Sequence, residues 1–318
     1  MADNSKIVWT EATWNPVSGC SKVSEGCRNC YAEREWSRLS KLVPAYAGRN
    51  FEDVACHPDR LAQPLRWKRP RKIFVNSMSD LFHPDVPEDF IDRVFAIMAL
   101  CPHHTFQILT KRPERMRDYL SKNRRENWAY AAVHDWGKYD PDGIFDHLAY
   151  AEGPLPNVWL GVSVEDQKTA DERIPLLLGT PSALRWVSIE PMIGPIVLEE
   201  VPVGMFGPLR WKGSPEGLSK IDWIVVGGES GPTARPMEAE WVRKIKDECE
   251  EAKVPLFVKQ LGAAYSDPVD GIAGSALKIS EDAIPLLKRR LKHRSGADME
   301  EWPEEFRVRE YPKDKLPG

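Results

Sequence analysis

Six short apolar runs recur along the chain, each ending in polar residues and followed by a segment with helical spacing. Near-continuous apolar runs of this length are typical of strands that are buried on both faces of a sheet. Their alternation with helices predicts a parallel sheet in an α/β fold, built as a full or partial (β/α) barrel similar to a TIM barrel. The predicted strands are 72–78, 105–111, 158–163, 184–190, 222–228 and 255–260, with 6–10 as an extra strand candidate. The predicted helices are 31–42, 87–100, 113–120, 166–178 and 238–252.

Two long segments interrupt this alternation. Residues 121–156 and 199–220 exceed the length of simple connections, and their aromatic content argues against disorder. We expect both insertions to cover the open face of the barrel. The barrel is predicted to span 1–262, and 263–318 to pack on it as a C-terminal extension containing a helix over 280–294.

Each predicted strand ends on side chains that can donate or accept hydrogen bonds or carry charge. The carboxyl ends of all strands in a (β/α) barrel open onto one face, and active sites are built there. One polar strand end is ordinary loop chemistry, whereas six together predict a site. The candidate residues at these ends are Ser77, Asp80, Lys111, Ser163, Glu165, Glu190, Gly228 and Glu229.

The segment 14–31 holds three cysteines, Cys20, Cys27 and Cys30, within eleven residues. Its proline and glycine content predicts a loop that leads directly into the helix at 31–42. Such a loop lets several side chains converge on one point. In a protein of the cytoplasm, a tight cysteine cluster indicates metal binding rather than a disulfide.

Three thiolates leave a metal centre one protein ligand short. A structural zinc site is normally closed by a fourth Cys or His, for which Cys56 or His57 is within reach. An iron–sulfur cluster held by three cysteines instead keeps one iron with an open position. The residues alone leave both kinds of centre open.

Composition narrows the class of protein further. The 318 residues are 42% hydrophobic and 29% charged, which is typical of a globular protein with an ample core. The first residues lack a signal sequence, and no apolar run approaches the roughly 20 residues that span a bilayer, so we expect a cytoplasmic protein with no membrane contact. The net charge of −4 attracts no nucleic acid overall. Basic runs at 66–72 and 288–294 could follow a phosphate backbone, although such runs are more often solvated surface.

Several motifs along the chain together resemble the three-Cys-motif phage protein family, whose activity is unassigned. The similarity runs from about residue 9 to residue 311. The motifs lie at 9–16, the cysteine loop with 31–33, 76–82, 109–113, 161–165, 189–191, 227–231 and 302–303. Members of this family resemble radical S-adenosylmethionine (SAM) enzymes in their cysteine cluster and barrel, and are often encoded beside a separate partner protein.

This resemblance implies a cofactor and a mechanism. The three cysteines would hold three irons of a 4Fe-4S cluster, and the amino and carboxylate groups of SAM would chelate the fourth. An electron from the cluster would break a carbon–sulfur bond, giving methionine and a 5′-deoxyadenosyl radical that abstracts hydrogen from substrate.

The same resemblance implies roles for the strand ends. Ser77, Asp80, Ser163, Glu165 and Glu190 could bind the amino group, ribose or carboxylate of SAM. Lys111 could pair with that carboxylate or with a substrate phosphate. Gly228 and Glu229 resemble the glycine-rich turn that meets the SAM amino group.

The chain departs from the radical SAM pattern at three points. Six residues separate Cys20 from Cys27, where three are usual, and Asn29 stands before the last cysteine in place of an aromatic residue. The Gly228–Glu229 turn follows a late strand rather than the second. The alternative function is a non-catalytic zinc- or cluster-binding module that recognises nucleic acid. For the enzyme, the substrate could be nucleic acid, a nucleotide or a partner protein.

Overall fold

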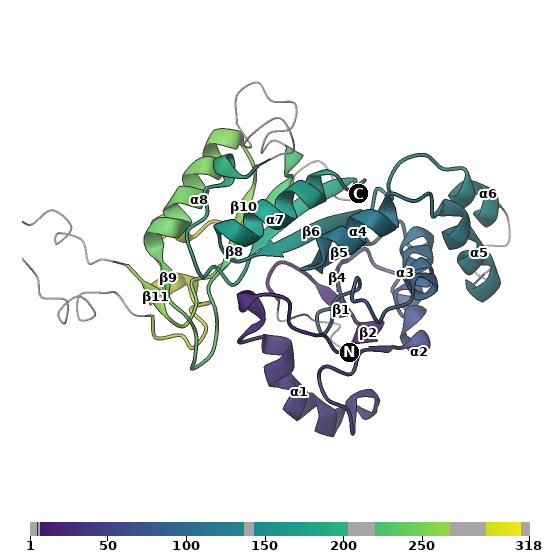
Figure 1. The fold of residues 1–318 in the computed structure, drawn as a ribbon, viewed down its shortest axis with the longest axis horizontal. Helices are drawn as coiled ribbons and strands as arrows, with labels where there is room; N and C mark the ends of the chain where they lie inside the picture. Colours follow the sequence, from purple (N-terminus) through teal and green to yellow (C-terminus); the bar gives the residue numbers. More distant parts are fainter. Residues whose placement is uncertain (1–4, 6, 137–142, 203–219, 268–290, 313–318) are drawn as a thin grey trace, which may run out of the picture.

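Seven parallel strands form one open sheet that curves into a half-barrel, in the order β1-β4-β5-β6-β7-β8-β10 (Figure 1). The computed structural model describes residues 5, 7–136, 143–202, 220–267 and 291–312. The sheet strands are β1 (Ala12–Trp14), β4 (Lys72–Val75), β5 (Thr105–Thr110), β6 (Val158–Val164), β7 (Leu184–Ile189), β8 (Trp223–Gly227) and β10 (Leu256–Gln260). This architecture confirms the α/β prediction and selects a partial barrel over a closed one.

Helices follow most of the strands and two small two-stranded pairings lie outside the sheet. The helices are α1 (Tyr31–Leu42), α2 (Pro58–Leu61), α3 (Glu88–Leu100), α4 (Pro113–Leu120), α5 (Arg125–Trp136), α6 (Ile144–Ala149), α7 (Gln167–Leu178) and α8 (Ala239–Ala252). The small strands are β2 (Val17–Ser18) with β3 (Ala55–Cys56), and β9 (Met237–Glu238) with β11 (Tyr265–Ser266). The six predicted strands and the five predicted helices are all present.

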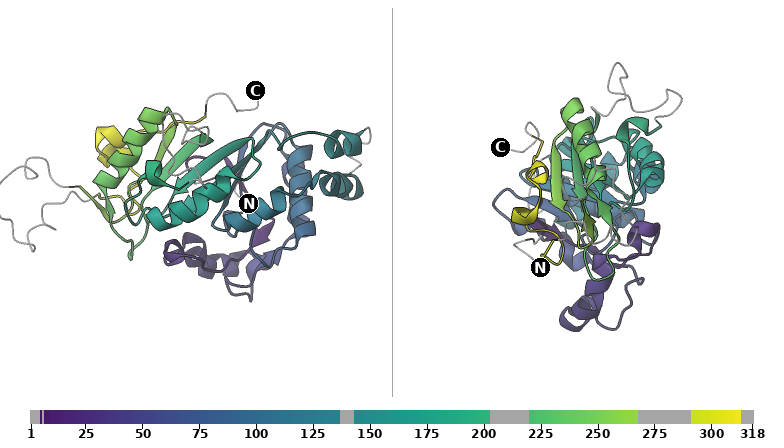
Figure 2. Two further views of the ribbon diagram at one scale, coloured as in Figure 1. Left: turned by 45° about the horizontal axis from the view of Figure 1, so that its top comes forward. Right: turned by 90° about the vertical axis from the view of Figure 1, so that its left-hand side faces the viewer.

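The two faces of the sheet carry different side chains because neighbouring residues of a strand point to opposite sides. Ile73 and Val75 face the helical layer and join the main core with residues of α3, α7 and α8. Phe74 faces the other way, into a second cluster that contains no helix residue. Figure 2 shows the helices and the sheet from two further directions.

Local sequence starts the helices where the strands end. At α7, the Asp166 carboxylate accepts the backbone N–H of Thr169 at 2.9 Å, and the Thr169 hydroxyl in turn accepts the N–H of Asp166 at 3.1 Å. This capping box satisfies two backbone donors that a helix leaves unpaired at its start. At α4, Pro113 occupies the first turn, where its missing N–H costs nothing.

The face without helices is filled at its amino-terminal end by aromatic rings. Trp9 packs edge-on against Phe74 and Trp186, with ring centroids 4.8 and 5.2 Å apart. Gly161 makes room for this packing, since a Cβ there would lie 2.5 Å from the Trp186 ring. The predicted strand at 6–10 is therefore wrong: residues 7–10 form a turn that carries Trp9 into the cluster, Lys6 lies outside the described residues, and the extra strand is β1.

The predicted insertions have different outcomes. Residues 125–149 contain α5 and α6, and α5 packs on α3 at the side of the sheet rather than over its carboxyl end, so the prediction of a cover is wrong for this segment. The apolar side chains of α5, such as Trp128, are buried against Phe95, which explains the position. Most of 199–220 lies outside the described residues, as do residues 280–290 of the helix predicted at 280–294; its described part, 291–294, is not helical.

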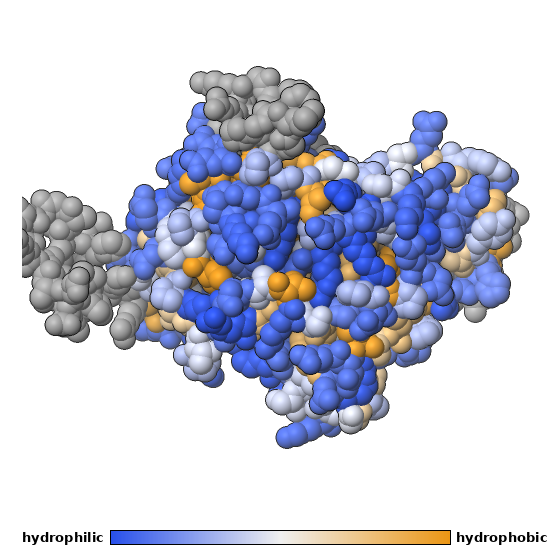
Figure 3. Space-filling view, viewed as in Figure 1, coloured by the Kyte–Doolittle hydropathy of each residue, from blue (hydrophilic) through white to orange (hydrophobic). Residues whose placement is uncertain are grey.

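The C-terminal residues that the structure describes pack along the last strand. The backbone N–H of Val258 in β10 donates to the carbonyl of Val308 at 2.9 Å, and the Tyr311 ring stacks on Trp223 at 5.4 Å. Trp302 and Phe306 are buried. In the described part of the chain, no helix has the length and apolarity to cross a membrane. The face in Figure 3 is largely hydrophilic, with separate small apolar patches.

The buried His104 is expected to make the stability of the fold depend on pH. Burial, with the neighbouring His103 adding to it, lowers the pKa of His104 from 6.5 to about 4. The unfolded chain therefore binds a proton here below about pH 6.5 while the folded chain does not, so stability falls as the pH drops from 6.5 to 4. Replacing His104 with Phe should make this fall shallower in urea unfolding measured at pH 7 and pH 4.5. Identical losses of stability in the two proteins would contradict the assignment.

Candidate metal centre

The cysteine loop crosses the carboxyl ends of the strands and is attached there at three points. The first attachment follows β4. The N–H of Gly19 donates to the carbonyl of Met78 at 3.1 Å, and the N–H of Cys20 donates to the carbonyl of Phe51 at 2.9 Å. Gly19 has a φ of +88°, and a Cβ there would lie 2.5 Å from the carbonyl of Asp53. Only glycine fits this turn.

The second attachment is to the end of β6. The hydroxyl of Ser24 donates to Oε1 of Glu165 at 3.2 Å. Gly26 lies so close to the same side chain that a Cβ would be 2.3 Å from Cγ of Glu165. The middle of the loop is therefore packed directly against a buried carboxylate.

The third attachment is to the loop after β8. Asn29 donates through Nδ2 to Oε2 of Glu229 at 2.8 Å and to the carbonyl of Thr233 at 2.9 Å. Arg34 of α1 donates to the carbonyl of Ser230 at 2.7 Å. The loop thus connects the ends of β4, β6 and β8. Asn29, which stands where an aromatic residue is usual, forms one of these attachments.

Replacing Asn29 with Ala is expected to loosen the loop. The change removes three hydrogen bonds, two donated by Asn29 to a carboxylate and a carbonyl and one accepted from the Thr233 hydroxyl, at a cost of roughly 1–3 kcal/mol. Because Lys22 and Arg28 lie in the loop, limited trypsin digestion should cleave it faster in the variant. Glu35→Ala, which removes only an exposed ion pair with Arg38, is the matched control and should leave the cleavage rate unchanged. Equal cleavage of all three proteins would show that Asn29 does not hold the loop.

Burial raises the pKa of two thiols of the loop, those of Cys20 and Cys30. Burial is the main cause of the raised values and brings the pKa of Cys20 to about 11, with Asp80 adding to it and Arg112 opposing it. Burial also raises the pKa of Cys30, while Lys111 acts in the opposite direction. A metal that binds here must displace protons from these thiols.

Of the two candidate fourth ligands for zinc, Cys56 lies in β3 and His57 directly follows that strand. Cys56 pairs with Val17 in the β2–β3 ladder, and His57 hydrogen-bonds through Nε2 to the Ser18 hydroxyl at 2.7 Å. The His57 ring is thus held by Ser18, whereas the ladder uses only the backbone of Cys56 and leaves its thiol free. Among the residues that the structure describes, no three Cys, His, Asp or Glu side chains converge closely enough to hold a metal ion as they stand.

His83 is also near the loop, and both of its ring nitrogens are engaged. Its Nε2 hydrogen-bonds to the Ser21 hydroxyl at 2.7 Å, and its Nδ1 accepts the N–H of Asp85 at 3.2 Å. Burial lowers the pKa of His83, and the nearby Arg112 acts in the same direction. A neutral His83 therefore supports the loop through Ser21.

Asp80 and Arg112 join the first cysteine to the sheet. Asp80 is buried and accepts the hydroxyl of Thr110 at 2.8 Å and the guanidinium of Arg112 at 3.1 Å. The same Nη1 of Arg112 lies 3.5 Å from Sγ of Cys20, and its Nη2 donates to the carbonyl of Ser21 at 3.0 Å. Arg112 places a permanent positive charge beside the thiol, which opposes the rise in the pKa of Cys20 without cancelling it.

Lys111, Ser163 and Glu165 converge at the centre of the sheet. The Lys111 ammonium donates to the hydroxyl of Ser163 at 2.6 Å and is ion-paired with Glu165. Glu165 is 1% exposed and also accepts Nη1 of Arg173 from α7 at 3.0 Å. Two cations therefore compensate one buried carboxylate, and Lys111 is the partly exposed member.

Two more ion pairs lie at the carboxyl ends of the later strands, after β7 and β8. Glu190 at the end of β7 pairs with Lys259 of β10, and both are partly exposed. Glu229 accepts Nη2 of Arg235 at 2.6 Å. Burial alone would raise the pKa of Glu229, but the hydrogen bonds from Arg235 and Asn29 lower it below its usual range. Glu229 is therefore a charged anchor for the loop.

Two of the sequence-predicted residues have other roles. Ser77 donates to Oδ1 of Asn15 at 3.1 Å, and its carbonyl accepts the Tyr31 hydroxyl, so it supports the start of α1. Gly228 is a packing residue, since a Cβ there would lie 2.5 Å from the carbonyl of Leu261. The other six strand-end residues lie along the same carboxyl end as the cysteine loop.

Sequence reasoning assigned no role to four residues that complete the site. Asn29 stood out only as a departure from the aromatic pattern, and Arg112 only as a neighbour of Lys111. No sequence motif pointed to Arg173 or Arg235, because only the folded helix or loop brings them to Glu165 and Glu229, respectively.

Comparison with known proteins gives a family and a distant structure. The model of a family described as "Protein of unknown function (DUF5131)" matches residues 4–304. No curated protein matches the chain. A solved structure of a spore photoproduct lyase mutant, in which serine replaces a cysteine, is similar with a TM-score of 0.34 and 10% identity, over 79% of this chain and 62% of that one. The chain thus spans less than two thirds of that structure's length.

Proposed function

We propose that this chain, which belongs to the DUF5131 family of proteins of unknown function, is a radical SAM-type enzyme. In this proposal Cys20, Cys27 and Cys30 hold a 4Fe-4S cluster and leave one iron open. The observation that carries it is the cysteine loop itself. Three cysteines lie on a segment attached across the carboxyl ends of a half-barrel, and the ring of His57, one of the two candidate zinc ligands, is hydrogen-bonded to Ser18.

The cluster and SAM, when bound, would supply a one-electron cleavage of a carbon–sulfur bond. The chain's own groups would bind and orient the two. Lys111 is a partly exposed ammonium beside the loop and suits the carboxylate of SAM or a substrate phosphate. Glu190, partly exposed at the end of β7, two strands along the sheet from Lys111, suits the amino group or a ribose hydroxyl. Glu165 and Glu229 are committed to holding the loop in place.

We further propose that the protein is one of the three-Cys-motif phage proteins, acting with a separately encoded partner on nucleic acid, a nucleotide or that partner. The support is the set of motifs along the chain, of which 76–82, 109–113, 161–165, 189–191 and 227–231 lie at the carboxyl ends of strands. The exposed Lys68 and Arg69 of the basic run before β4 offer a surface for phosphate, away from the cysteine loop.

Anaerobic reconstitution with iron and sulfide tests the function. The expected product is a brown protein with about four irons per chain. After reduction with dithionite, it should convert SAM to methionine and 5′-deoxyadenosine, measured by chromatography. The control is the protein reconstituted without a reductant, which should leave SAM intact.

Two results would overturn the proposal. A colourless protein that binds one zinc per chain would mean a structural metal module instead. A protein that holds the cluster but never cleaves SAM would contradict the proposed enzyme activity, while the assignment of the three cysteines as cluster ligands would stand. The nucleic-acid module would then predict binding that weakens steeply with salt.

A further inference from the structure

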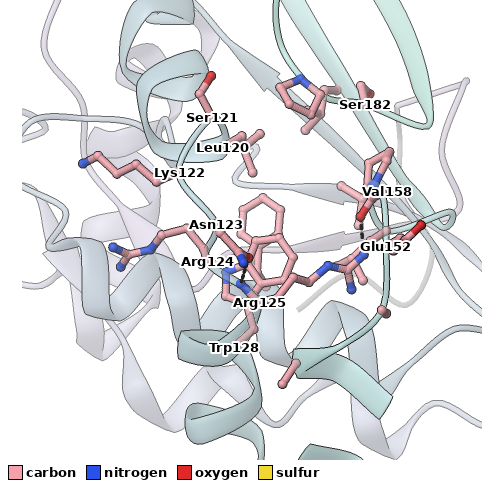
Figure 4. A pocket seen from close by; sticks show the side chains of 18 of the residues that line it. Leu120, Ser121, Lys122, Asn123, Arg124, Arg125, Trp128, Glu152, Val158 and Ser182 are labelled. Atoms are coloured by element: carbon pink, nitrogen blue, oxygen red, sulfur yellow. Dashed lines mark hydrogen bonds between the residues drawn. The ribbon is translucent and has the colours of Figure 1, made fainter. Parts of the chain in front are cut away.

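A pocket of about 480 Å³ lies at the opposite end of the sheet from the cysteine loop. It is bordered by Val158, the first residue of β6, and by Ser182, which precedes β7. The inserted segment with α5 and α6 forms its other wall (Figure 4). Its volume is within the range of sites that take small molecules. Nothing in the proposed radical chemistry uses it.

Arg125 is the unusual member of this pocket. It is only 8% exposed, and its guanidinium makes one described hydrogen bond, from Nη2 to the carbonyl of Gly153. In the part of the chain that the structure describes, no carboxylate lies within ion-pair distance of it. A guanidinium has five N–H donors, so most of its donors are without a described acceptor. Burial lowers its pKa, and no charged neighbour opposes that effect.

The neighbouring cations differ from Arg125 because they are already neutralised. Arg124 pairs with Glu88 at 3.1 Å and with Asp92, and Lys122 pairs with Glu88 at 3.0 Å. Figure 4 shows Arg124 and Arg125 extending in opposite directions, with Arg125 directed along the wall that contains Glu152. Arg125 is thus the one charged group of this basic segment left without compensation in the described residues.

The indole ring of Trp128 holds the Arg125 guanidinium in position. The guanidinium lies 5.4 Å from the centroid of the Trp128 ring, and the other ring neighbour of Trp128 is Phe95, stacked at 4.8 Å. These contacts fix the cation at an apolar wall. Burying a cation without an anion is unfavourable, and a bound oxyanion would remove that cost.

We propose that this pocket binds a small organic anion, a phosphate or carboxylate head on an apolar body, with Arg125 as the residue that recognises the head. The planar guanidinium can donate two parallel hydrogen bonds to either head group. Leu155, Leu160 and Pro181 offer apolar contact for the body of the ligand. The proposal is independent of the cysteine loop, so it can fail or succeed without affecting the proposed function.

Calorimetric titration of the full chain tests the site. The probes are phenyl phosphate and benzoate, which differ in the head group, and inorganic phosphate, which lacks the apolar body. At least one aromatic probe should bind, more tightly than inorganic phosphate. In Arg125→Met its affinity should fall about tenfold or more, because a charge-assisted hydrogen bond contributes about 1.5–3 kcal/mol. The exposed Lys168→Met is the control and should bind as the wild type does.

Thermal unfolding without ligand gives a second readout. If Arg125 is kept for a ligand, Arg125→Met should unfold at the same temperature as the wild type or higher, because it removes an uncompensated buried charge. A large drop in unfolding temperature would mean that the guanidinium is structural, and would overturn the proposal. Absence of binding by both aromatic probes, or equal binding by the wild type and Arg125→Met, would also overturn it.

Discussion

The Cys27→Ala variant is expected to lose the iron–sulfur chromophore while keeping its fold. Cys27 is the second of the three cysteines of the loop. With two cysteines left, a 4Fe-4S cluster lacks a ligand, so iron should fall from about four per chain to below one. The side chain is half-buried in a loop outside the main core, so unfolding by urea should change little.

Cys56→Ser is the matched control for this result. Cys56 is also half-buried and free, but it lies in the β2–β3 ladder. It should therefore keep full iron and the visible absorbance band after anaerobic reconstitution. If Cys27→Ala retained its iron, the ligand assignment would be wrong. Loss of metal from Cys56→Ser alone would favour the zinc alternative.

The Arg173→Met variant is expected to lose about 3 kcal/mol or more of unfolding free energy. Arg173 donates Nη1 to Glu165 at 3.0 Å and to the carbonyl of Ser163 at 2.6 Å, and both members of the ion pair are almost fully buried. Removing one partner of a buried pair leaves an uncompensated charge, which is more costly than losing the contact itself. Lys111 remains as a second cation, which keeps the loss toward the lower end of the usual range.

The change should also reach the cysteine loop. Glu165 accepts the Ser24 hydroxyl and packs against Gly26, so a displaced carboxylate loosens the middle attachment of the loop. Urea unfolding gives the free energy, and trypsin digestion reports the loop. Arg38→Met, which removes only an exposed pair with Glu35, should change the free energy by less than about 1 kcal/mol. An unfolding curve for Arg173→Met that matches that of Arg38→Met would contradict the role given to the buried pair.

The apolar pattern predicted six of the seven sheet strands, because those strands are largely buried on both faces, but it missed β1. All seven residues of β6 are buried, and such a run is visible in the sequence without knowing its neighbours. The pattern was misleading at 6–10, where the apolar Trp9 belongs to a turn that fills the end of the half-barrel. It also could not tell that 125–149 packs on α3, because an aromatic side chain in an insertion can face either a lid or a core.

Local sequence determined the strands, the helices and the three thiols, since periodicity and spacing act within a few residues. The tertiary structure alone decided which charges meet. Asn29 and Glu229 are 200 positions apart, and Lys111 and Glu165 are 54 apart, yet each pair is in contact. Parallel pairing aligns the carboxyl ends of strands that are distant in the chain, so side chains without local signal become neighbours only when the sheet has formed.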